Sequence, residues 1–459
     1  MFHEKNKKVL PINNVSDVQL KLYGFDDYSH GNQKKRKIKN SSRTKNIQSQ
    51  FDVGEYTDSK IIISDEYSVK YSIDENGILN WINPVCPHCH TNKVKKWSLY
   101  SKNVVTEYFC GTIIMRRYMC KKCHKTFITD LEDQFDSHSN ISNSLKDKMI
   151  EIKELNWDSL RNISKYFEIF YGIKISPETV RKVLIVIEGN EIDYEIPKLS
   201  GYYGYDAQWV KINKKWKYRH ALYDLVHRMP IAELFAEEET NGDVYYLINK
   251  YTEPNNRKAI VTDTKPGYDT VMRDLKFKRH QYCVFHFKYN LNKKIKEDLN
   301  KQKRKIKSKL EKQYENKSQT FINDKVEDEL KPIKDENKYA LQLLYYVFNE
   351  ESFDKALCYV ELIKANMVNF PKVIREYVED VFLPNHKSYL YYLEEPYKGK
   401  LDDTNNKIEG YFRATMPKGY KRKFRTFKGL INQIYHRGNG LIRNQKERNK
   451  HKKPTRFVR

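Results

Sequence analysis

One stretch of the sequence, residues 257–287, constrains the fold more than any other. It begins with a short apolar run, Ala259–Val261, which leads to Asp263. A turn and a short helical pattern follow, and a second apolar run then carries Cys283 and His286. Strand, helix and strand in this order are typical of an α/β sheet, in which ligand-binding carboxylates lie at strand ends. We therefore expect Asp263 to lie where a buried strand ends.

Three strand-like segments come before this stretch, at residues 202–212, 217–226 and 230–237. The first carries Asp206, and a helical pattern at residues 246–251 follows the third. Three meandering strands, a helix, a strand, a helix and a strand are the order of a ribonuclease-H-like sheet. We expect residues 198–287 to form the first part of such a catalytic core.

A third acidic residue, Glu409, lies in the segment 402–415. Thr404 or Asn405 can cap a helix there, so Glu409 is expected just past the first turn. The apolar residues on either side of it are spaced i, i+4 and can bury the helix against the sheet; they are Ile408 and Phe412. Two nearby acids, Asp402 and Asp403, could take the place of Glu409 in such a site. Alternatively, they precede the helix and interact favourably with its dipole.

Asp206, Asp263 and Glu409 together predict a metal-dependent phosphoryl-transfer site. Carboxylates on two strands and one helix can hold two divalent cations, and Mg²⁺ or Mn²⁺ prefers such oxygen ligands. Two ions ~3.5–4 Å apart activate an attacking oxygen and stabilise the leaving one. A glycosidase would need only two carboxylates. Asp224 is expected to be a hairpin residue rather than a metal ligand.

Four of the seven cysteines form two Cys-x-x-Cys pairs: Cys86, Cys89, Cys120 and Cys123. Two such pairs on tight turns predict a tetrahedral structural zinc site, in a zinc ribbon over residues 80–132. A redox pair or a chance pattern is the alternative. Three adjacent histidines could replace a cysteine as ligand: His88, His90 and His124. Cys110, between the pairs, is expected to be a small buried thiol.

Residues 140–192 are expected to form a DNA-binding helix-turn-helix. An amphipathic segment starts at Ser159, and after a break at Gly172 a second helix opens with Ser176 as N-cap and a proline at its first position. Three residues of the second helix are then available to contact DNA; they are Thr179, Arg181 and Lys182. An ordinary helical hairpin is the alternative.

The charge of the chain indicates a polyanionic partner. The formal net charge is +25, which is typical of nucleic-acid-binding proteins, although an AT-rich genome also inflates the lysine content. Residues 417–459 hold 15 Lys and Arg against one Glu. Within them, residues 418–428 alternate basic and aromatic side chains, and a solvated face is the alternative to phosphate contacts there. The residues predicted to contact phosphates are Lys421, Arg422, Lys423 and Arg425.

The remaining segments complete the expected organisation. We expect a basic, weakly ordered region at 1–79, a helical basic insertion at 288–400, the Glu409 helix at 401–440 and a basic tail at 441–459. Four aromatic residues are expected in the core or on a strand face rather than as base-stacking platforms: Tyr205, Trp209, Trp216 and Phe412. No segment approaches the ~20 apolar residues of a membrane span, and the first residues lack a signal-peptide pattern. We therefore expect a soluble, intracellular protein.

These motifs resemble those of a DDE-type insertion-sequence transposase of the Mutator-like group. The matching residues are Asp206 before a basic hairpin, Asp263 at a strand end, Cys283-Val-Phe-His286, and Asn406-Lys-Ile-Glu409 after a helical insertion. The match covers roughly residues 80–440. It implies an α/β fold, with a ribonuclease-H-like mixed sheet and a helical insertion, preceded by a zinc ribbon and a helix-turn-helix.

The resemblance also implies a function. Such a transposase binds terminal inverted repeats, cleaves a DNA strand and joins its 3′-hydroxyl to target DNA, using two Mg²⁺ or Mn²⁺ ions at the catalytic carboxylates. Cys283, His286 and Asn406 would support the active site, structural Zn²⁺ would hold the ribbon, and a homodimer or larger complex would act. We expect a cytoplasmic, nucleoid-associated protein in a prokaryote, or a nuclear one in a eukaryote. The alternatives are an inactive, domesticated DNA-binding protein and a metal-dependent nuclease without strand transfer.

Overall fold

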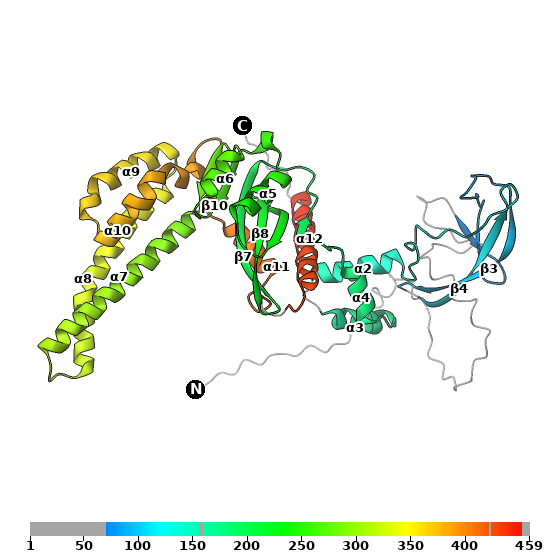
Figure 1. The fold of residues 1–459 in the computed structure, drawn as a ribbon, viewed down its shortest axis with the longest axis horizontal. Coiled ribbons are helices and arrows are strands. Elements are labelled where there is room, and N and C mark those ends of the chain that lie inside the picture. Colours follow the sequence, from blue (N-terminus) through cyan, green and yellow to red (C-terminus); the bar gives the residue numbers. More distant parts are fainter. Residues whose placement is uncertain (1–69, 108, 156–158, 422–423, 452–459) are drawn as a thin grey trace, which may run out of the picture. The chain divides into compact units, whose positions relative to one another are not determined.

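The computed structural model describes residues 70–107, 109–155, 159–421 and 424–451 (Figure 1). They belong to two compact units. The first unit comprises the described residues up to 104 together with 109–130, and the second comprises 105–107 and the described residues from 131 onward. Residues 1–69 of the expected basic, weakly ordered region lie outside the described residues.

The first unit is a five-stranded sheet, coloured blue in Figure 1. Its order is β1-β2-β4-β3, and β5 pairs with β4. In β4, the buried residues Ile113 and Met115 alternate with more exposed neighbours, as in a strand with one face in a core. Residues 70–79 were expected to be weakly ordered, but they include β1 and the start of β2. The strands are β1 (Tyr71–Ile73), β2 (Ile78–Trp81), β3 (Val94–Val105), β4 (Cys110–Cys120) and β5 (Thr126–Ile128).

The second unit contains a six-stranded sheet of order β11-β10-β7-β8-β9-β6. The pairs β7–β8, β8–β9 and β9–β6 are antiparallel, whereas the pairs β7–β10 and β10–β11 are parallel. Helix α5 (Asn241–Tyr251) lies between β9 and β10, and α6 (Tyr268–Asp274) between β10 and β11, so the fold is mixed α/β. The strands are β6 (Glu191–Asp193), β7 (Tyr202–Ile212), β8 (Lys215–Asp224), β9 (Met229–Ala236), β10 (Ala259–Thr262) and β11 (Arg279–Tyr282).

Helices cover both faces of the six-stranded sheet (Figure 1). Tyr203 and Tyr205 of β7 pack with α5 and α6 on one face. Tyr202 packs with α11 (Asn406–Thr415) and Val210 with α12 (Phe427–His451) on the other face. This alternation follows from the two-residue period of a strand. The expected apolar anchor of α11, Ile408, is buried.

Three helices precede the six-stranded sheet: α2 (Asn143–Leu155), α3 (Leu160–Tyr171) and α4 (Pro177–Leu184). The predicted cap of α4 is confirmed, and α3 has a serine cap as well. Ser159 accepts a hydrogen bond from the N–H of Asn162, and Ser176 accepts one from the N–H of Thr179. Gly172 ends α3 with a φ of 66°, a left-handed conformation that suits glycine.

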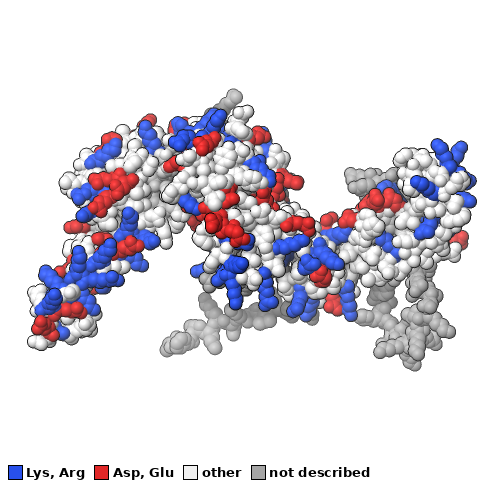
Figure 2. Space-filling model, viewed as in Figure 1, with Lys and Arg blue, Asp and Glu red and all other residues white. Residues whose placement is uncertain are grey.

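A helical insertion lies between β11 and α11. Residues 288–318 hold 12 Lys and Arg against 4 Asp and Glu, and Figure 2 shows basic side chains gathered along the α7–α8 pair. None of the helices in the described part of the chain is long and apolar enough to cross a membrane. The helices of the insertion are α7 (Val284–Gln313), α8 (Gln319–Tyr346), α9 (Phe353–Asn366) and α10 (Lys372–Tyr377), followed by short 3₁₀ and π turns.

Candidate active site

Asp206 and Asp263 lie on neighbouring parallel strands. In the register of β7 and β10, Gly204 is paired with Val261. Continuing this register by two residues places Asp263, which follows the last residue of β10, beside Asp206. Because β7 runs on to Ile212, the two carboxylates lie at the edge of the sheet where β10 ends. Ligands bind at such an edge in open α/β sheets.

Helix α11 brings Glu409 to the same part of β7. A Cβ at Gly204 would lie 2.6 Å from Cδ1 of Ile408, so the helix approaches the strand so closely that a larger residue would displace the Ile408 side chain. Glu409 follows Ile408 in the first turn of α11. The alternative acid Asp402 pairs instead with Nζ of Lys407, at 2.8 Å.

Asn405 ties the start of α11 to the sheet. Its side-chain Nδ2 donates to the carbonyl oxygen of Tyr205 (3.1 Å), and its backbone N–H donates to Sγ of Cys283 (3.4 Å). Asn405 is buried, whereas Asn406, which the resemblance assigned to active-site support, is exposed. The sequence suggested Asn405 only as a cap, but its side chain makes no cap hydrogen bond. The side-chain amide of Asn405 instead donates its hydrogen bond to a strand that is about two hundred residues earlier in the chain.

The carboxylates act on one another through their charges. Burial, and then the charge of Asp263, raise the pKa of Asp206 well above its usual range. The N–H of Ala207, which donates to Asp206 at 2.8 Å, lowers the pKa of Asp206 and offsets part of this rise. The charges of Glu409 and Glu239 raise it further. Asp206 therefore shares its surroundings with three other acids.

Glu239, between β9 and α5, is an acid that sequence reasoning missed. It accepts a hydrogen bond from the hydroxyl of Tyr268 and pairs with Nζ of Lys265 at 2.9 Å. Burial raises the pKa of Asp263, the nearby charge of His286 lowers it, and the charge of Glu239 raises it. Glu239 ends an acidic run in a turn, which looks like a solvated loop, and only the folded sheet brings it near the carboxylates.

Cys283 and His286 lie beside the carboxylates, but not on a strand. β11 ends at Tyr282, Cys283 is the N-cap of α7, and His286 lies in the first turn of that helix. The expectation that the second apolar run continues as a strand through both residues is wrong, because the helix begins directly after β11. Burial raises the pKa of Cys283 to about 11, so its thiol is neutral and suits a packing role.

The donor set fits divalent cations by its chemistry. Carboxylate oxygens are the ligands that Mg²⁺ and Mn²⁺ prefer, and acids that raise the pKa of a neighbour are stabilised when a cation offsets their repulsion. Among the described residues, only the cysteine cluster below has three or more ligand atoms within 4.8 Å of one another. The carboxylates are thus spread more widely, as ligands divided between two ions can be.

We expect Asp206→Asn to stabilise the ion-free protein. The pKa of Asp206 is raised, so the folded chain keeps a proton that the unfolded chain releases above about pH 4. Its contribution to stability therefore falls as pH rises above that value, and the Asn variant lacks this loss. Urea unfolding in EDTA should show a gain of about 1–3 kcal/mol at pH 7 that disappears near pH 4.

The matched control for this prediction is Asp193→Asn, because Asp193 is an exposed acid on β6 of the same sheet. It should leave the pH dependence of stability unchanged. Added Mg²⁺ should stabilise the wild-type protein and not Asp206→Asn, since only a folded state that binds the ion gains stability. Equal pH slopes for the wild-type protein and Asp206→Asn would contradict the placement of Asp206 among repelling acids.

A buried ion pair holds α11 in place. Arg219 on β8 and Glu233 on β9 are fully buried, and Nη2 of Arg219 donates to Oε1 of Glu233 at 2.9 Å. The same Nη2 donates to Oγ1 of Thr415 at 2.8 Å, and the hydroxyl of Tyr411 donates to Glu233. Thr415 and Tyr411 both belong to α11. The pair thus connects the strands to the helix of Glu409.

Arg219→Met should lower the free energy of unfolding by about 3–5 kcal/mol, because it leaves the Glu233 carboxylate buried without its partner. Urea denaturation followed by tryptophan fluorescence measures this. Arg413→Ala, an exposed arginine of α11, should cost less than about 0.5 kcal/mol. The double variant Arg219→Met with Glu233→Leu should recover part of the loss, and no recovery would show that the charge itself is not responsible.

The two Cys-x-x-Cys pairs converge in the first unit. The Sγ atoms of Cys86 and Cys123 are 3.7 Å apart, and those of Cys89 and Cys120 are 3.5 Å apart. All four lie within 4.8 Å of one another and could hold a metal ion. Burial alone would raise the pKa of Cys120, but the N–H groups of Cys123 and Lys122 and the thiols of Cys89 and Cys123 lower it to about 6. Burial and the hydrogen bond to Cys120 raise the pKa of Cys89 to about 12, so Cys120 is the cysteine of this pair that more readily supplies the thiolate that zinc binds. Cys110, expected to be buried, is exposed.

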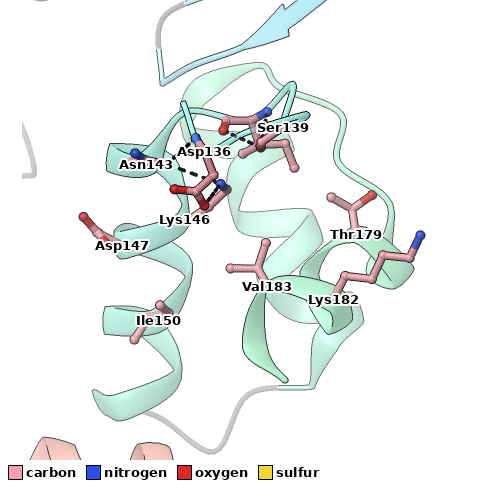
Figure 3. A pocket seen from close by; sticks show the side chains of 10 residues that line it. Asp136, Ser139, Asn143, Lys146, Asp147, Ile150, Thr179, Lys182 and Val183 are labelled. Carbon is pink, nitrogen blue, oxygen red and sulfur yellow. Dashed lines mark hydrogen bonds and ion pairs between the residues drawn. The ribbon is translucent and has the colours of Figure 1, made fainter. Parts of the chain in front are cut away.

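The predicted DNA contacts of α4 differ in their surroundings. Thr179 and Lys182 line a cavity of about 540 Å³ opposite Asp147 and Lys146 of α2 (Figure 3). Lys182 is exposed. Arg181 instead forms two hydrogen bonds to the Glu178 carboxylate of its own helix, at 2.7 and 2.6 Å. Any phosphate would have to compete with Glu178 for Arg181, so Lys182 is the more accessible cation.

The predicted basic run after α11 lies along the end of β7. The N–H of Lys211 donates to the carbonyl of Lys421, and the N–H of Asn213 to that of Phe424, both at 3.2 Å. Lys421 is half-buried and Arg425 is exposed. Arg422 and Lys423 lie outside the described residues.

The chain resembles an insertion-element protein. Over 429 residues it is 28% identical to the insertion element ISM1 uncharacterized 48.3 kDa protein of Methanobrevibacter smithii, which covers 93% of this chain and 95% of that protein. No family model matches the chain. A chain in the cryoEM structure of a simian T-cell lymphotropic virus intasome in complex with PP2A regulatory subunit B56 gamma is also similar, at 10% identity over 39% of this chain and 66% of that chain. The TM-score of that match is 0.17, too low to support an argument.

The similarity to the insertion-element protein is not confined to one part of the chain. A match over 93% of the residues must include most of both compact units.

Proposed function

We propose that this protein is a DDE-type DNA transposase. The observation that carries the proposal is the register of β7 and β10, which puts Asp206 beside Asp263, with the Glu409 helix packed on the same strand at Gly204. The order of strands and helices in the second unit is the one expected of a ribonuclease-H-like core. The similarity along the chain to a protein named for an insertion element supports a role in DNA transposition.

In the proposed reaction, Asp206, Asp263 and Glu409 would hold two divalent cations beside the scissile phosphodiester. When bound, two Mg²⁺ or Mn²⁺ ions supply charge stabilisation and an activated oxygen for in-line displacement. Other residues of the chain hold the helix that carries Glu409: Asn405 binds the start of α11 to β7. The Arg219–Glu233 pair binds the rest of that helix to β8 and β9. His286, whose charge acts on Asp263, is placed to favour the ionised carboxylate.

The other parts of the chain would recognise DNA. We propose that the cysteine cluster is a structural zinc site of a ribbon, and that α3 and α4 form a helix-turn-helix that contacts the ends of the element. The basic residues after α11 would contact phosphates near the reacting strand. The protein would act on paired ends as a dimer or larger complex, next to the nucleoid of a prokaryotic host.

A strand-transfer assay tests the proposal. The DNA that flanks the reading frame on either side supplies the end substrates, a plasmid supplies the target, and Mg²⁺ or Mn²⁺ starts the reaction. Joined products that depend on both flanks support a transposase. Cleavage without joining would indicate a nuclease, and binding of the flanks without cleavage would indicate an inactive DNA-binding protein.

A further inference from the structure

The β7–β8 hairpin extends past the rest of the sheet. β10 pairs with β7 only at residues 202–204, whereas β8 pairs with it as far as Ile212. The hairpin turns at Asn213 and Lys214, whose φ angles are 45° and 67°, as in a tight two-residue turn that follows the twist of the strands. From Asp206 to Val210, no strand in the described part of the chain pairs with this edge of β7.

One face of this hairpin carries exposed aromatic rings. Trp209 is 52% exposed and Trp216 is 44% exposed, although their sizes favour burial. The ring centroids of Trp209 and Tyr218 lie 4.1 Å apart, and those of Trp209 and Trp216 lie 6.1 Å apart with perpendicular planes. Nζ of Lys211 lies 5.1 Å from the centre of the Trp216 ring. Tyr205, by contrast, is buried as expected. We call Trp209, Trp216 and Tyr218 the aromatic face.

The surroundings of the aromatic face are basic. Residues 207–218 contain four lysines and no acid, and the backbone of Lys421 and Phe424 is hydrogen-bonded to the end of β7. Figure 2 shows Lys and Arg side chains gathered at the lower end of the sheet, where Figure 1 places the tip of the hairpin. Among the described residues, Lys217 is the one lysine of this group with an acidic partner, which is Glu237. The lysines are Lys211, Lys214, Lys215 and Lys217.

We propose that the aromatic face stacks on unpaired nucleobases of the DNA held at the carboxylate site. Exposed aromatic rings between lysines suit single-stranded nucleic acid, because rings stack on bases and lysines contact phosphates. Trp209 lies three residues from Asp206 on one strand, roughly 10 Å away, but points to the opposite face of the sheet. A base paired in a duplex over Asp206 cannot reach it, whereas an unpaired base can pass around the open edge of β7. The inference rests on the proposed function for the position of the DNA.

The experiment compares binding of the full chain to a DNA duplex and to the same duplex with an unpaired loop. Fluorescence anisotropy in EDTA measures both affinities without cleavage, and 2-aminopurine in the loop reports stacking by a loss of fluorescence. We expect tighter binding to the looped DNA and quenching by the wild-type protein. Trp209→Ala should weaken looped binding about tenfold, leave duplex binding unchanged and abolish quenching. Trp209→Phe should restore most of both.

Trp97→Ala is the matched control, since Trp97 is 53% exposed on β3 and Nζ of Lys95 lies 5.1 Å from its ring centre. It should leave the ratio of looped to duplex affinity unchanged. Equal losses for both DNAs in Trp209→Ala, or no quenching by the wild-type protein, would overturn the inference. If Trp209→Ala melts at a lower temperature than the wild type, the same two affinities and the quenching are measured for Trp216→Ala. Stacking without strand transfer would retain this inference and reject the transposase, and the reverse result would reject the inference alone.

Discussion

Asp263→Asn should lower the rate of DNA strand cleavage by about 10³-fold or more. The side chain follows the last residue of β10, beside Asp206, and Asn keeps its shape while removing the charge that holds a divalent cation. Charge stabilisation by metal ions is worth several kcal/mol in the transition state, which corresponds to a factor of this size. The rate is measured on the flanking DNA with Mg²⁺ under single-turnover conditions.

Binding of the DNA ends should survive this substitution, because Asp263 follows β10, whereas Lys182, which is proposed to contact them, lies on α4. Asp274→Asn is the matched control, since Asp274 is an exposed acid at the end of α6, and it should cleave at the wild-type rate. If Asp263→Asn cleaves normally, Asp263 is not a metal ligand. If both variants lose cleavage, the loss reflects a general effect of charge on DNA binding.

Cys120→Ser should remove the zinc that we propose for the cysteine cluster and unfold the strands around it. Sγ of Cys120 is buried and lies 3.5 Å from that of Cys89, so three ligands and a hydroxyl remain. Structural zinc contributes on the order of 10 kcal/mol to folding, because the site exists only in the folded state. Elemental analysis should show about one zinc per chain in the wild type and almost none in the variant, with weaker binding of the DNA ends.

Cys110→Ser is the control for this variant. Cys110 begins β4 in the same unit but is exposed, so its zinc content and DNA binding should equal those of the wild type. Unchanged zinc in Cys120→Ser would mean that the four cysteines are not the ligands. Zinc loss with unchanged end binding would separate the cluster from DNA recognition.

The sequence predicted features that depend on neighbours in the chain. Ser176 was identified as a cap because a side-chain oxygen can reach an N–H three residues later. Asp206 was placed within a strand and Asp263 at a strand end from their apolar neighbours, and both placements agree with β7 and β10. The spacing of the two cysteine pairs predicted a cluster, and the four sulfurs converge.

Exposure was predicted less well. Cys110 was expected to be buried and is exposed. Trp209 and Trp216 were expected in the core or on a strand face, and they lie on a strand face with both rings about half exposed. A hydrophobic pattern shows which residues share a face, but not where the covering helices stop. The sequence therefore does not predict how far the β7–β8 hairpin extends past the neighbouring strands.

The sequence by itself determined the kinds of side chain present and the local structure that carries them: three carboxylates on two strands and a helix, and two pairs of cysteines on turns. Only the tertiary structure decided which distant groups meet. Glu239 approaches the carboxylates, Asn405 binds the strand of Asp206, and Arg219 pairs with Glu233 under α11. These contacts depend on strand register and on the packing of a helix that follows a long insertion. Such contacts are set by burial across the whole chain and leave no periodic signal along it.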